Sequence, residues 1–402
     1  MSDWKTYRLG EFIDINPRVT LKQGNEYSFV EMKDLNATFK YVSPSAKREL
    51  KGGSKFQNGD TLFARITPCL ENGKICQVKK LENNVGFGST EFLVFRGKEN
   101  VSDNDFVYYL SRSEFVKNNA VQMMTGTSGR QRVEKSALEQ LEITAPDLPT
   151  QRQIAQILSS LDDKIELNLQ MNQTLEAMAQ AIFKEWFVNF NFPGFDGELV
   201  DGLPKGWKYK TIKELGRVIT GNTPSSKNPE FFGEVTPFVT PTDFKNFGKL
   251  IIGANRYLSD AGRTALKTRL LPKNSIIATC IGSDMGKIAI NAIECVTNQQ
   301  INSIIPIDTY LVDYLYYDLV YKYDYLRNIA TGGSTMPIIN KSRFEEIEIL
   351  TPNSDLLKEF QSLMDSFNSK IEENIRQSQS LTRTRDTLLP KLMSGNIAVM
   401  NA

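Results

Sequence analysis

The stretch that decides the fold is residues 148–188, which read LPTQRQIAQILSSLDDKIELNLQMNQTLEAMAQAIFKEWFV. Thr150 followed by Gln153 predicts a capping box at the start of a helix. Core positions then recur every seven residues, at Ile154, Leu161, Asn168, Leu175 and Ile182. Ile157, Met171 and Met178 supply the complementary positions, with a break at Lys164. The pattern predicts a helix from Gln151 to Val188, ~57 Å long at ~1.5 Å per residue, that acts as a spacer.

The second half of the chain repeats the first. A shift of 206 residues places Gly126 and Ser128 on Gly332 and Ser334. The matches continue in the same order into a second helix, whose seven-residue positions are Phe360, Phe367, Asn374, Leu381 and Leu388. Pro390 should end or kink that helix. Because these matches preserve their order through a loop and a helix, duplication explains them better than chance.

In each long helix the core positions line up along one side and form a seam that can pack on a second helix. Both seams carry an asparagine at the same seven-residue position, Asn168 and Asn374. A lone polar residue at a core position costs stability but can fix register and partner choice. The alternative is that each asparagine lies in water at the edge of the seam. We favour the register interpretation because both copies have it.

Each helix follows a globular segment, which gives four consecutive parts: 1–149, 150–199, 200–354 and 355–402. Apolar runs such as 61–66, 92–95, 275–279 and 301–305 predict strands in the globular segments. Residues 108–121 and 312–328 are expected to be helical, with their tyrosine pairs in the core. Gly86-Phe87-Gly88 reads as a turn. The fold class is therefore α+β, with two mixed globular domains joined by long helices in an internal pseudo-two-fold repeat.

Composition excludes several classes of protein. The 402 residues are 40% hydrophobic and 24% charged, which allows two or three packed domains. No run approaches the roughly 18 apolar residues of a membrane span, so a soluble cytoplasmic protein is expected. The four cysteines lack a C-x-x-C pairing and the chain has no histidine, which argues against a metal site and against a Ser-His-Asp arrangement.

The charge balance bears on DNA binding. With 48 basic and 47 acidic residues the net charge is +1, which argues mildly against a protein that wraps DNA unaided. It fits a DNA-binding protein that shares its contacts to DNA with partner subunits, or one whose basic residues are gathered on one face of the molecule. Composition does not separate these two.

The amino-acid sequence of the predicted helical regions resembles the conserved regions of type I restriction specificity subunits. The resemblance is carried by residues 148–188, by 385–395 (RDTLLPKLMSG) and by 203–207 (LPKGW), the entry to the second globular segment. It covers the whole chain in layout, and residues 150–190 and 355–399 in detail.

The resemblance implies a non-catalytic, sequence-specific DNA-binding subunit. Each globular segment would be a target-recognition domain for one half of a bipartite, asymmetric site on double-stranded DNA, and the long helices would pack as an antiparallel coiled coil that sets the gap. Two modification subunits would methylate adenine with S-adenosylmethionine, and restriction subunits using ATP and Mg would cleave unmodified DNA. This chain would itself hold no cofactor.

The motifs agree with a reader that performs no chemistry. The sequence has no G-x-x-x-x-G-K-[ST] loop and no Asp/Asn-Pro-Pro-aromatic tetrapeptide. A self-contained nuclease or methyltransferase would need one of these or a carboxylate cluster with lysine. The remaining alternative is a coiled-coil scaffold that binds protein, which predicts salt-insensitive association and no DNA sequence preference.

One glycine-rich loop in each copy is a candidate for DNA contact. Residues 125–132 offer Thr127, Ser128, Arg130 and Arg132, on a backbone that glycines allow to approach a phosphate or base closely. The counterpart offers Ser334, Thr335 and Lys341. The alternative is a surface turn with solvated arginines.

A second candidate pair involves Arg65 and Lys74 in the first copy and Lys287 in the second. Arg65 interrupts an apolar strand, so it must be paired or emerge at an edge. Functional and structural interpretations of Arg65 both remain open at this point.

Overall fold

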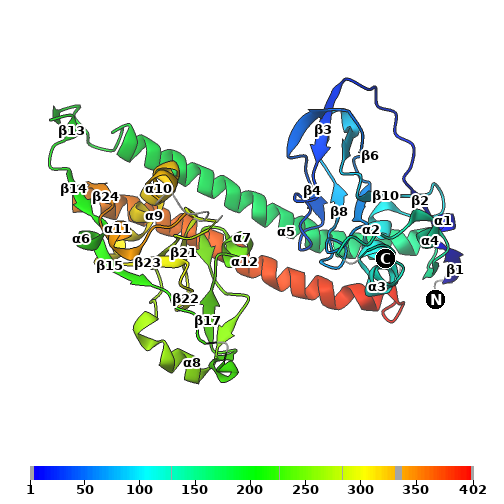
Figure 1. Ribbon diagram of the computed structural model, residues 1–402. Helices are drawn as coiled ribbons and strands as arrows, with labels where there is room; N and C mark the ends of the chain where they lie inside the picture. The colour runs from blue at the N-terminus through cyan, green and yellow to red at the C-terminus, as the bar shows by residue number, and fades with distance from the viewer. Residues whose placement is uncertain (1–3, 128, 226, 283, 331–336, 400–402) are drawn as a thin grey trace. The chain divides into compact units, whose positions relative to one another are not determined.

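The computed structural model describes residues 4–127, 129–225, 227–282, 284–330 and 337–399. Its contacts divide the chain into two units: unit 1 is Met1–Leu169 with Arg376–Ala402, and unit 2 is Gln170–Ile375. Each unit combines one globular segment with parts of two long helices, α5 (Leu148–Phe183) and α12 (Ser354–Met393) (Figure 1). The boundary between the units crosses both helices, whereas the four segments read from the sequence follow one another along the chain.

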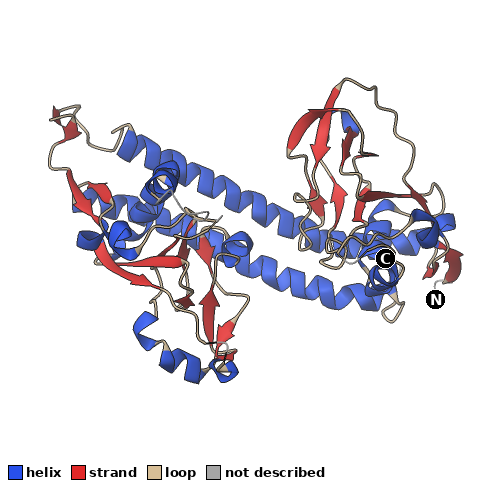
Figure 2. Cartoon of the chain, viewed as in Figure 1, coloured by secondary structure: helices blue, strands red, loops and turns tan. Residues whose placement is uncertain are grey.

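In its described residues unit 1 contains three sheets, four short α-helices and a 3-10 turn at Glu82–Asn84 (Figure 2). The five-stranded sheet has the order β2 (Ile13–Ile15), β10 (Phe92–Gly97), β7 (Thr61–Ala64), β8 (Ile75–Val78), β4 (Tyr41–Val42). The four-stranded sheet has the order β5 (Ala46–Glu49), β3 (Glu26–Val30), β9 (Val85–Gly88), β6 (Ser54–Gln57). The remaining elements are β1 (Lys5–Arg8) paired with β11 (Glu142–Ala145), and α1 (Leu9–Phe12), α2 (Asn104–Arg112), α3 (Glu114–Gln122) and α4 (Lys135–Glu139).

Unit 2 has a matching set. Its five-stranded sheet has the order β15 (Gly216–Thr220), β23 (Ile301–Pro306), β20 (Ile276–Thr279), β21 (Ile288–Asn291), β18 (Leu250–Ile251). Its four-stranded sheet has the order β16 (Phe232–Gly233), β19 (Tyr257–Leu258), β17 (Thr236–Val239), β22 (Val296–Thr297). The two-stranded sheets are β14 (Lys208–Thr211) with β24 (Glu348–Thr351), and β12 (Leu199–Val200) with β13 (Leu203–Pro204). The helices are α6 (Ile212–Leu215), α7 (Asp243–Phe247), α8 (Asp260–Ala265), α9 (Val312–Tyr321), α10 (Tyr323–Ile329) and α11 (Lys341–Glu345).

The two five-stranded sheets share one topology. Strand for strand, β2-β10-β7-β8-β4 corresponds to β15-β23-β20-β21-β18. In both sheets the last strand pairs in parallel and the others pair antiparallel. Because the same non-sequential order appears twice, the internal repeat and the mixed α+β fold predicted from the sequence are confirmed.

The predicted strands are present because their residues are buried on both faces. All four residues of β7 are buried, and so are all four of β20, so these strands read as continuous apolar runs. The turn predicted at Gly86-Phe87-Gly88 is wrong, because these residues belong to β9. A Cβ on Gly88 would lie 2.4 Å from the Val30 carbonyl oxygen, so close approach of β3 explains the glycine.

The helices predicted over 108–121 and 312–328 each prove to be two helices. Ser113 separates α2 from α3, and its hydroxyl accepts a hydrogen bond from the Val116 backbone N–H. Lys322 separates α9 from α10 in unit 2. The tyrosine pairs on α2 and α9 are buried, as the sequence predicts.

The ends of the long helices differ from the prediction. The α5 helix begins at Leu148, so Thr150 is inside it, and the Asp147 carboxylate accepts from the Thr150 N–H at 3.2 Å. At its other end α5 continues into a π-helical turn, Lys184–Val188. Pro390 does not end α12, which runs on to Met393.

The complementary seam positions also differ from the prediction by one residue. Leu158 and Ile165 are 0% and 3% exposed, whereas Ile157 and Met178, which the sequence analysis placed in the seam, are 38% and 48% exposed. Core positions therefore alternate by four and three residues, and Lys164 interrupts nothing. The same spacing holds in α12, where Met364 and Ile371 are buried.

The two seam asparagines are buried within their own units. In unit 1 the Asn168 amide donates to Gln377 Oε1 at 2.9 Å and to Ser378 Oγ at 3.2 Å. In unit 2 the Asn374 amide donates to Asn172 Oδ1 at 2.8 Å. Asn168 and Asn374 are 0% and 1% exposed, so the alternative position in water is wrong. Their role in fixing register stays a prediction.

The helices pair in opposite directions within unit 1. Asp162, early in α5, contacts Arg385, late in α12, while Asn168 contacts Gln377. As residue numbers rise along α5 they fall along α12, which is the antiparallel arrangement. None of the described helices is long and apolar enough to cross a membrane.

Candidate nucleic-acid interface

The glycine loop of unit 1 stands on a closed stem. The Thr125 and Arg132 backbones exchange two hydrogen bonds, both 2.9 Å long. The stem is fixed to the end of β7, because the Thr67 N–H donates to the Gln131 carbonyl oxygen at 3.0 Å and Thr67 Oγ1 accepts from the Gln131 N–H at 3.1 Å. Gly126, with φ 128°, and Gly129, with φ 78°, adopt conformations that favour glycine. The rigid stem therefore presents an exposed tip that contains Thr127 and Arg130.

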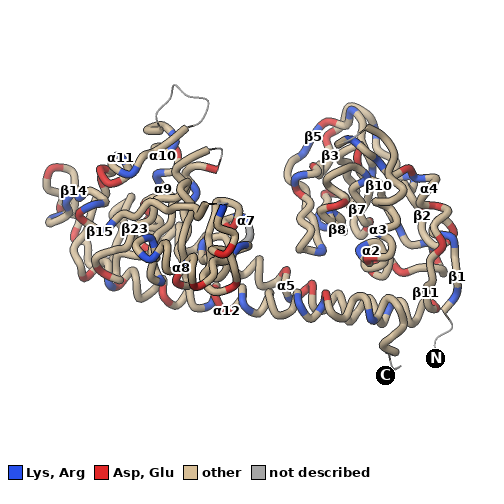
Figure 3. The backbone as a smooth tube through the Cα atoms, turned by 60° about the horizontal axis from the view of Figure 1, so that its bottom comes forward, with Lys and Arg blue, Asp and Glu red and all other residues tan. Residues whose placement is uncertain are grey.

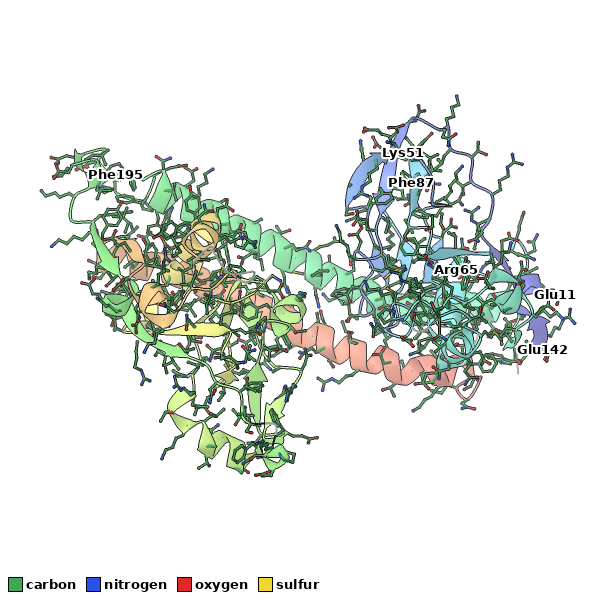
Figure 4. All side chains as sticks on the ribbon, viewed as in Figure 1. Glu11, Lys51, Arg65, Phe87, Glu142 and Phe195 are labelled. Carbon is green, nitrogen blue, oxygen red and sulfur yellow. The ribbon has the colours of Figure 1, made fainter. Side chains whose placement is uncertain are left out.

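The arginines of the stem are held by carboxylates. Arg132 makes a two-pronged contact with Glu91, at 2.6 Å from Nη2 and 2.9 Å from Nε. That hydrogen bonding lowers the pKa of the Glu91 carboxyl. Arg65 Nη2 lies 2.8 Å from Glu134 Oε1, and Figure 4 shows Arg65 toward the helical end of unit 1, away from Lys51 and Phe87. Both guanidinium groups already have anionic partners, which offset part of the positive charge that each could offer to DNA.

Arg130 differs from these two. Its side chain is exposed, and none of the described residues offers it a hydrogen bond or an ion pair. Ser128, the neighbouring candidate on the tip, lies outside the described residues. Among the predicted loop residues, Arg130 is therefore the arginine whose guanidinium group is available to bind a phosphate or a base edge.

Lys74 has an internal partner. Its ammonium donates to the Met32 carbonyl oxygen at 2.7 Å, which holds the segment after β3 against the turn before β8. This contact gives the Lys74 side chain a structural role within unit 1.

Among the described residues of unit 2, one backbone bridge corresponds to the unit 1 arrangement. Ile281, after β20, bridges to Ile338, as Ile66 bridges to Arg132 in unit 1. The turn after Ile281 carries Lys287, whose ammonium lies 2.5 Å from Asp284. Lys341 lies 3.4 Å from Glu345 on α11. Ser334 and Thr335, the predicted tip residues, lie outside the described residues.

A basic groove in unit 1 was missed by the sequence analysis. It encloses about 620 Å³ between the segment after β2 and strand β6, and its lining includes Arg18, Ser54 and Lys55. Among the described residues neither Arg18 nor Lys55 has a carboxylate partner. Ser54 Oγ donates to the Phe92 carbonyl oxygen at 2.7 Å, next to the Glu91 that holds Arg132. One lining residue of the groove thus bonds to the neighbour in sequence of Glu91, the carboxylate that holds Arg132. Only folding brings Arg18 and Lys55 together, so no local motif signals them.

Charges of both signs are distributed over each unit, as Figure 3 shows. Within the described residues no three His, Cys, Asp or Glu side chains form a metal-binding group.

Comparison with known proteins identifies the family. The family description "Type I restriction modification DNA specificity domain" matches residues 1–177 and 204–381. The chain is 32% identical to the type I restriction enzyme HindI specificity subunit of Haemophilus influenzae, over 99% of this chain and all of that protein. It is 26% identical to the MjaIX specificity subunit of Methanocaldococcus jannaschii, over 99% of this chain and 94% of that protein.

A solved structure supports the fold. The type I restriction-modification S subunit from M. genitalium superimposes with a TM-score of 0.57 at 16% identity, over 100% of this chain and 97% of that one. The chain belongs to the type I restriction-modification specificity subunits, a family of subunits that recognise DNA sequence.

Proposed function

We propose that this chain reads a two-part, asymmetric DNA sequence, with one half-site bound by each unit, and directs adenine methylation or cleavage by partner subunits. The observation that supports the proposal is a duplicated backbone bridge beside the candidate loops, from Ile66 after β7 to Arg132 in unit 1 and from Ile281 after β20 to Ile338 in unit 2. Two copies of one reading element, with different side chains, suit two different half-sites. Half-sites read through the major groove lie about 34–36 Å apart, or at a multiple of that distance.

The chemistry belongs to partners in this proposal. Two modification subunits supply methyl transfer from S-adenosylmethionine, and restriction subunits supply ATP- and Mg-dependent cleavage. The balanced net charge of +1 fits a DNA grip that is shared with those subunits.

Methylation mapping tests the proposal. Adenine methylation is compared between cells with this chain and its modification subunit and cells that lack only this chain. We expect a two-part motif that disappears with the chain. Unchanged methylation, with the modification subunit demonstrably active, would rule out the specificity function and leave the protein-binding scaffold as the better account.

Arg130→Ala should weaken DNA binding by removing one open cation. If Arg130 contacts a phosphate, the slope of log K against log salt should fall by about 1, and if it contacts a base, the preference at one position should fall by about 1–3 kcal/mol. Titration of the assembled complex with half-site variants at several salt concentrations distinguishes the two. Lys33→Ala, which removes an exposed cation paired with Glu31 at 2.7 Å, is the control. An Arg130→Ala titration that overlays the control would exclude the contact.

The double substitution of Arg18 and Lys55 by alanine should reduce the salt slope by about 2, because two cations leave the groove. The methylated sequence itself should stay the same, since phosphate contacts carry no sequence information. Affinity at several salt concentrations and methylation mapping give the two readouts. An unchanged slope would remove the groove from the DNA-binding surface.

A further inference from the structure

Each unit buries one lysine at the same place in its fold. Lys40 immediately precedes β4 and Lys249 immediately precedes β18, the equivalent edge strands that pair in parallel. Their side chains are 0% and 4% exposed. Because an unpaired buried ammonium is very unfavourable, the partners of each lysine are a fixed part of the fold.

In unit 1 the lysine joins three elements. Lys40 Nζ lies 2.7 Å from Asp105 Oδ1 on α2 and 2.7 Å from Ser159 Oγ on α5. It also lies 5.0 Å from the centre of the Tyr109 ring, whose hydroxyl donates to Asp162 Oδ2 on α5 at 2.6 Å. One buried group thus connects the sheet edge, a helix of the globular segment and the long helix.

Unit 2 repeats this junction with different partners on the long helices. Lys249 Nζ lies 2.7 Å from Asp313 Oδ1 and 2.7 Å from the Tyr317 hydroxyl, both on α9. The Tyr317 hydroxyl donates to Glu176 Oε2 on α5 at 3.0 Å. Asp313 Oδ2 accepts from Asn368 on α12 at 2.8 Å, and from Gln361 as well. The lysine again connects the sheet edge, the domain helix and the long helices.

Stability alone does not explain a buried lysine in both copies, whose aspartate partner is 46% exposed in unit 1 and 0% exposed in unit 2. Apolar side chains of similar volume are often as stabilising as a buried pair or more so. Hydrogen bonds add direction: Lys40 donates to Asp105 and Ser159, and Lys249 donates to the Tyr317 hydroxyl. Their geometry tolerates little rotation or sliding of the elements that they join. A junction of this kind therefore restricts the angle between the globular segment and the long helices of the same unit.

We propose that Lys40 and Lys249 are positioning residues that hold each globular segment at a fixed angle on the long helices, and so determine which gap between the half-sites is accepted. The inference rests on the two-part reading proposed above. One added base pair moves a half-site by about 3.4 Å and turns it by about 34–36°. A segment locked to its helix cannot follow that displacement, whereas a segment free to tilt can.

The test measures gap tolerance in the complex assembled with modification subunits. The variants are K40M/D105N and K249M/D313N, in which methionine fills the lysine volume and asparagine keeps an acceptor for neighbouring donors. Methylation rates are compared on DNA with the native gap and with one base pair added or removed. We expect the preference for the native gap to fall about tenfold or more, equivalent to about 1.4 kcal/mol, with the half-site sequences unchanged.

Matched controls and a milder variant separate positioning from loss of folding. K33M and K245M remove exposed lysines, 73% and 61% accessible, and should keep the native gap preference. Y109F and Y317F remove one hydroxyl each and keep the ring. They should relax the gap preference in the same direction while leaving the thermal midpoint close to that of the wild type.

The outcomes are distinct. Lower rates at all gaps in the same proportion would show a structural role only and would overturn the proposal, as would unchanged gap preference in folded Y109F and Y317F. A wild-type complex that methylates no two-part motif would instead refute the proposed function, and the positioning role with it.

Discussion

Exchanging residues 1–149 for the corresponding segment of a family member with another specificity will change one half of the methylated site and leave the other half intact. All the strands of unit 1 and helices α1 to α4 lie within this segment, together with the glycine loop and the basic groove. Preference for the original first half-site should fall by about 10³-fold or more, the usual margin between specific and non-specific binding. Methylation mapping measures the result directly.

The reciprocal exchange of residues 200–354 serves as the matched experiment and should alter the other half alone. A chimera in which both half-sites change would contradict independent reading by the two units. The donor segment should carry a lysine, an aspartate and a tyrosine equivalent to Lys40, Asp105 and Tyr109, because Ser159 and Asp162 stay behind on α5.

Asp162→Ala will lower the free energy of unfolding by about 3–5 kcal/mol, the usual cost of breaking a buried ion pair by removing one partner. The Asp162 side chain is 1% exposed and that of Arg385 is 3% exposed, with 2.6 Å between Oδ1 and Nη1. The substitution also deprives the buried Tyr109 hydroxyl of its acceptor. Urea unfolding of the full chain, with the m-value checked for constancy, measures the loss.

Asp386→Ala is the control for this measurement. Asp386 contacts the same guanidinium at 2.9 Å, but its side chain is 54% exposed. Exposed pairs contribute about 0–1 kcal/mol, so its loss should be small. Equal losses for Asp162→Ala and Asp386→Ala would show that burial does not determine the strength of this pair.

The sequence predicted the repeat, the strands and the long helices, but it misplaced one side of the helical seam. Apolar residues occur both three and four positions after Ile154, at Ile157 and Leu158, so local spacing alone does not decide between them. The charged Lys164 in the predicted seam was the sequence feature that could have shown that these positions were displaced by one residue. Spacing by four places Ile165 in the core instead, and no break is then needed.

The sequence predicted the position of the candidate DNA-binding loop, but it did not predict which residues form ion pairs with the arginines of that loop. Glycine and hydroxyl content marks residues 125–132, whereas Glu91, which holds Arg132, is 41 residues away along the chain. Lys40 and Lys249 carried no local signal, because lysine is almost always exposed. Only the fold brings an aspartate to each, from a helix more than sixty residues later.

The duplicated junction also bears on how the two halves of the chain arose. Lysine, aspartate and the tyrosine pair occupy matching positions in both halves, so they belonged to the ancestral segment before it was copied. Their long-helix partners differ: Ser159 and Asp162 in one half, Glu176 and Asn368 in the other. Each globular segment therefore contacts a different set of long-helix side chains. A recombination event near residue 149, or one inside the glycine loop, therefore separates Lys40, Asp105 and Tyr109 from Ser159 and Asp162, the long-helix side chains on which their junction depends.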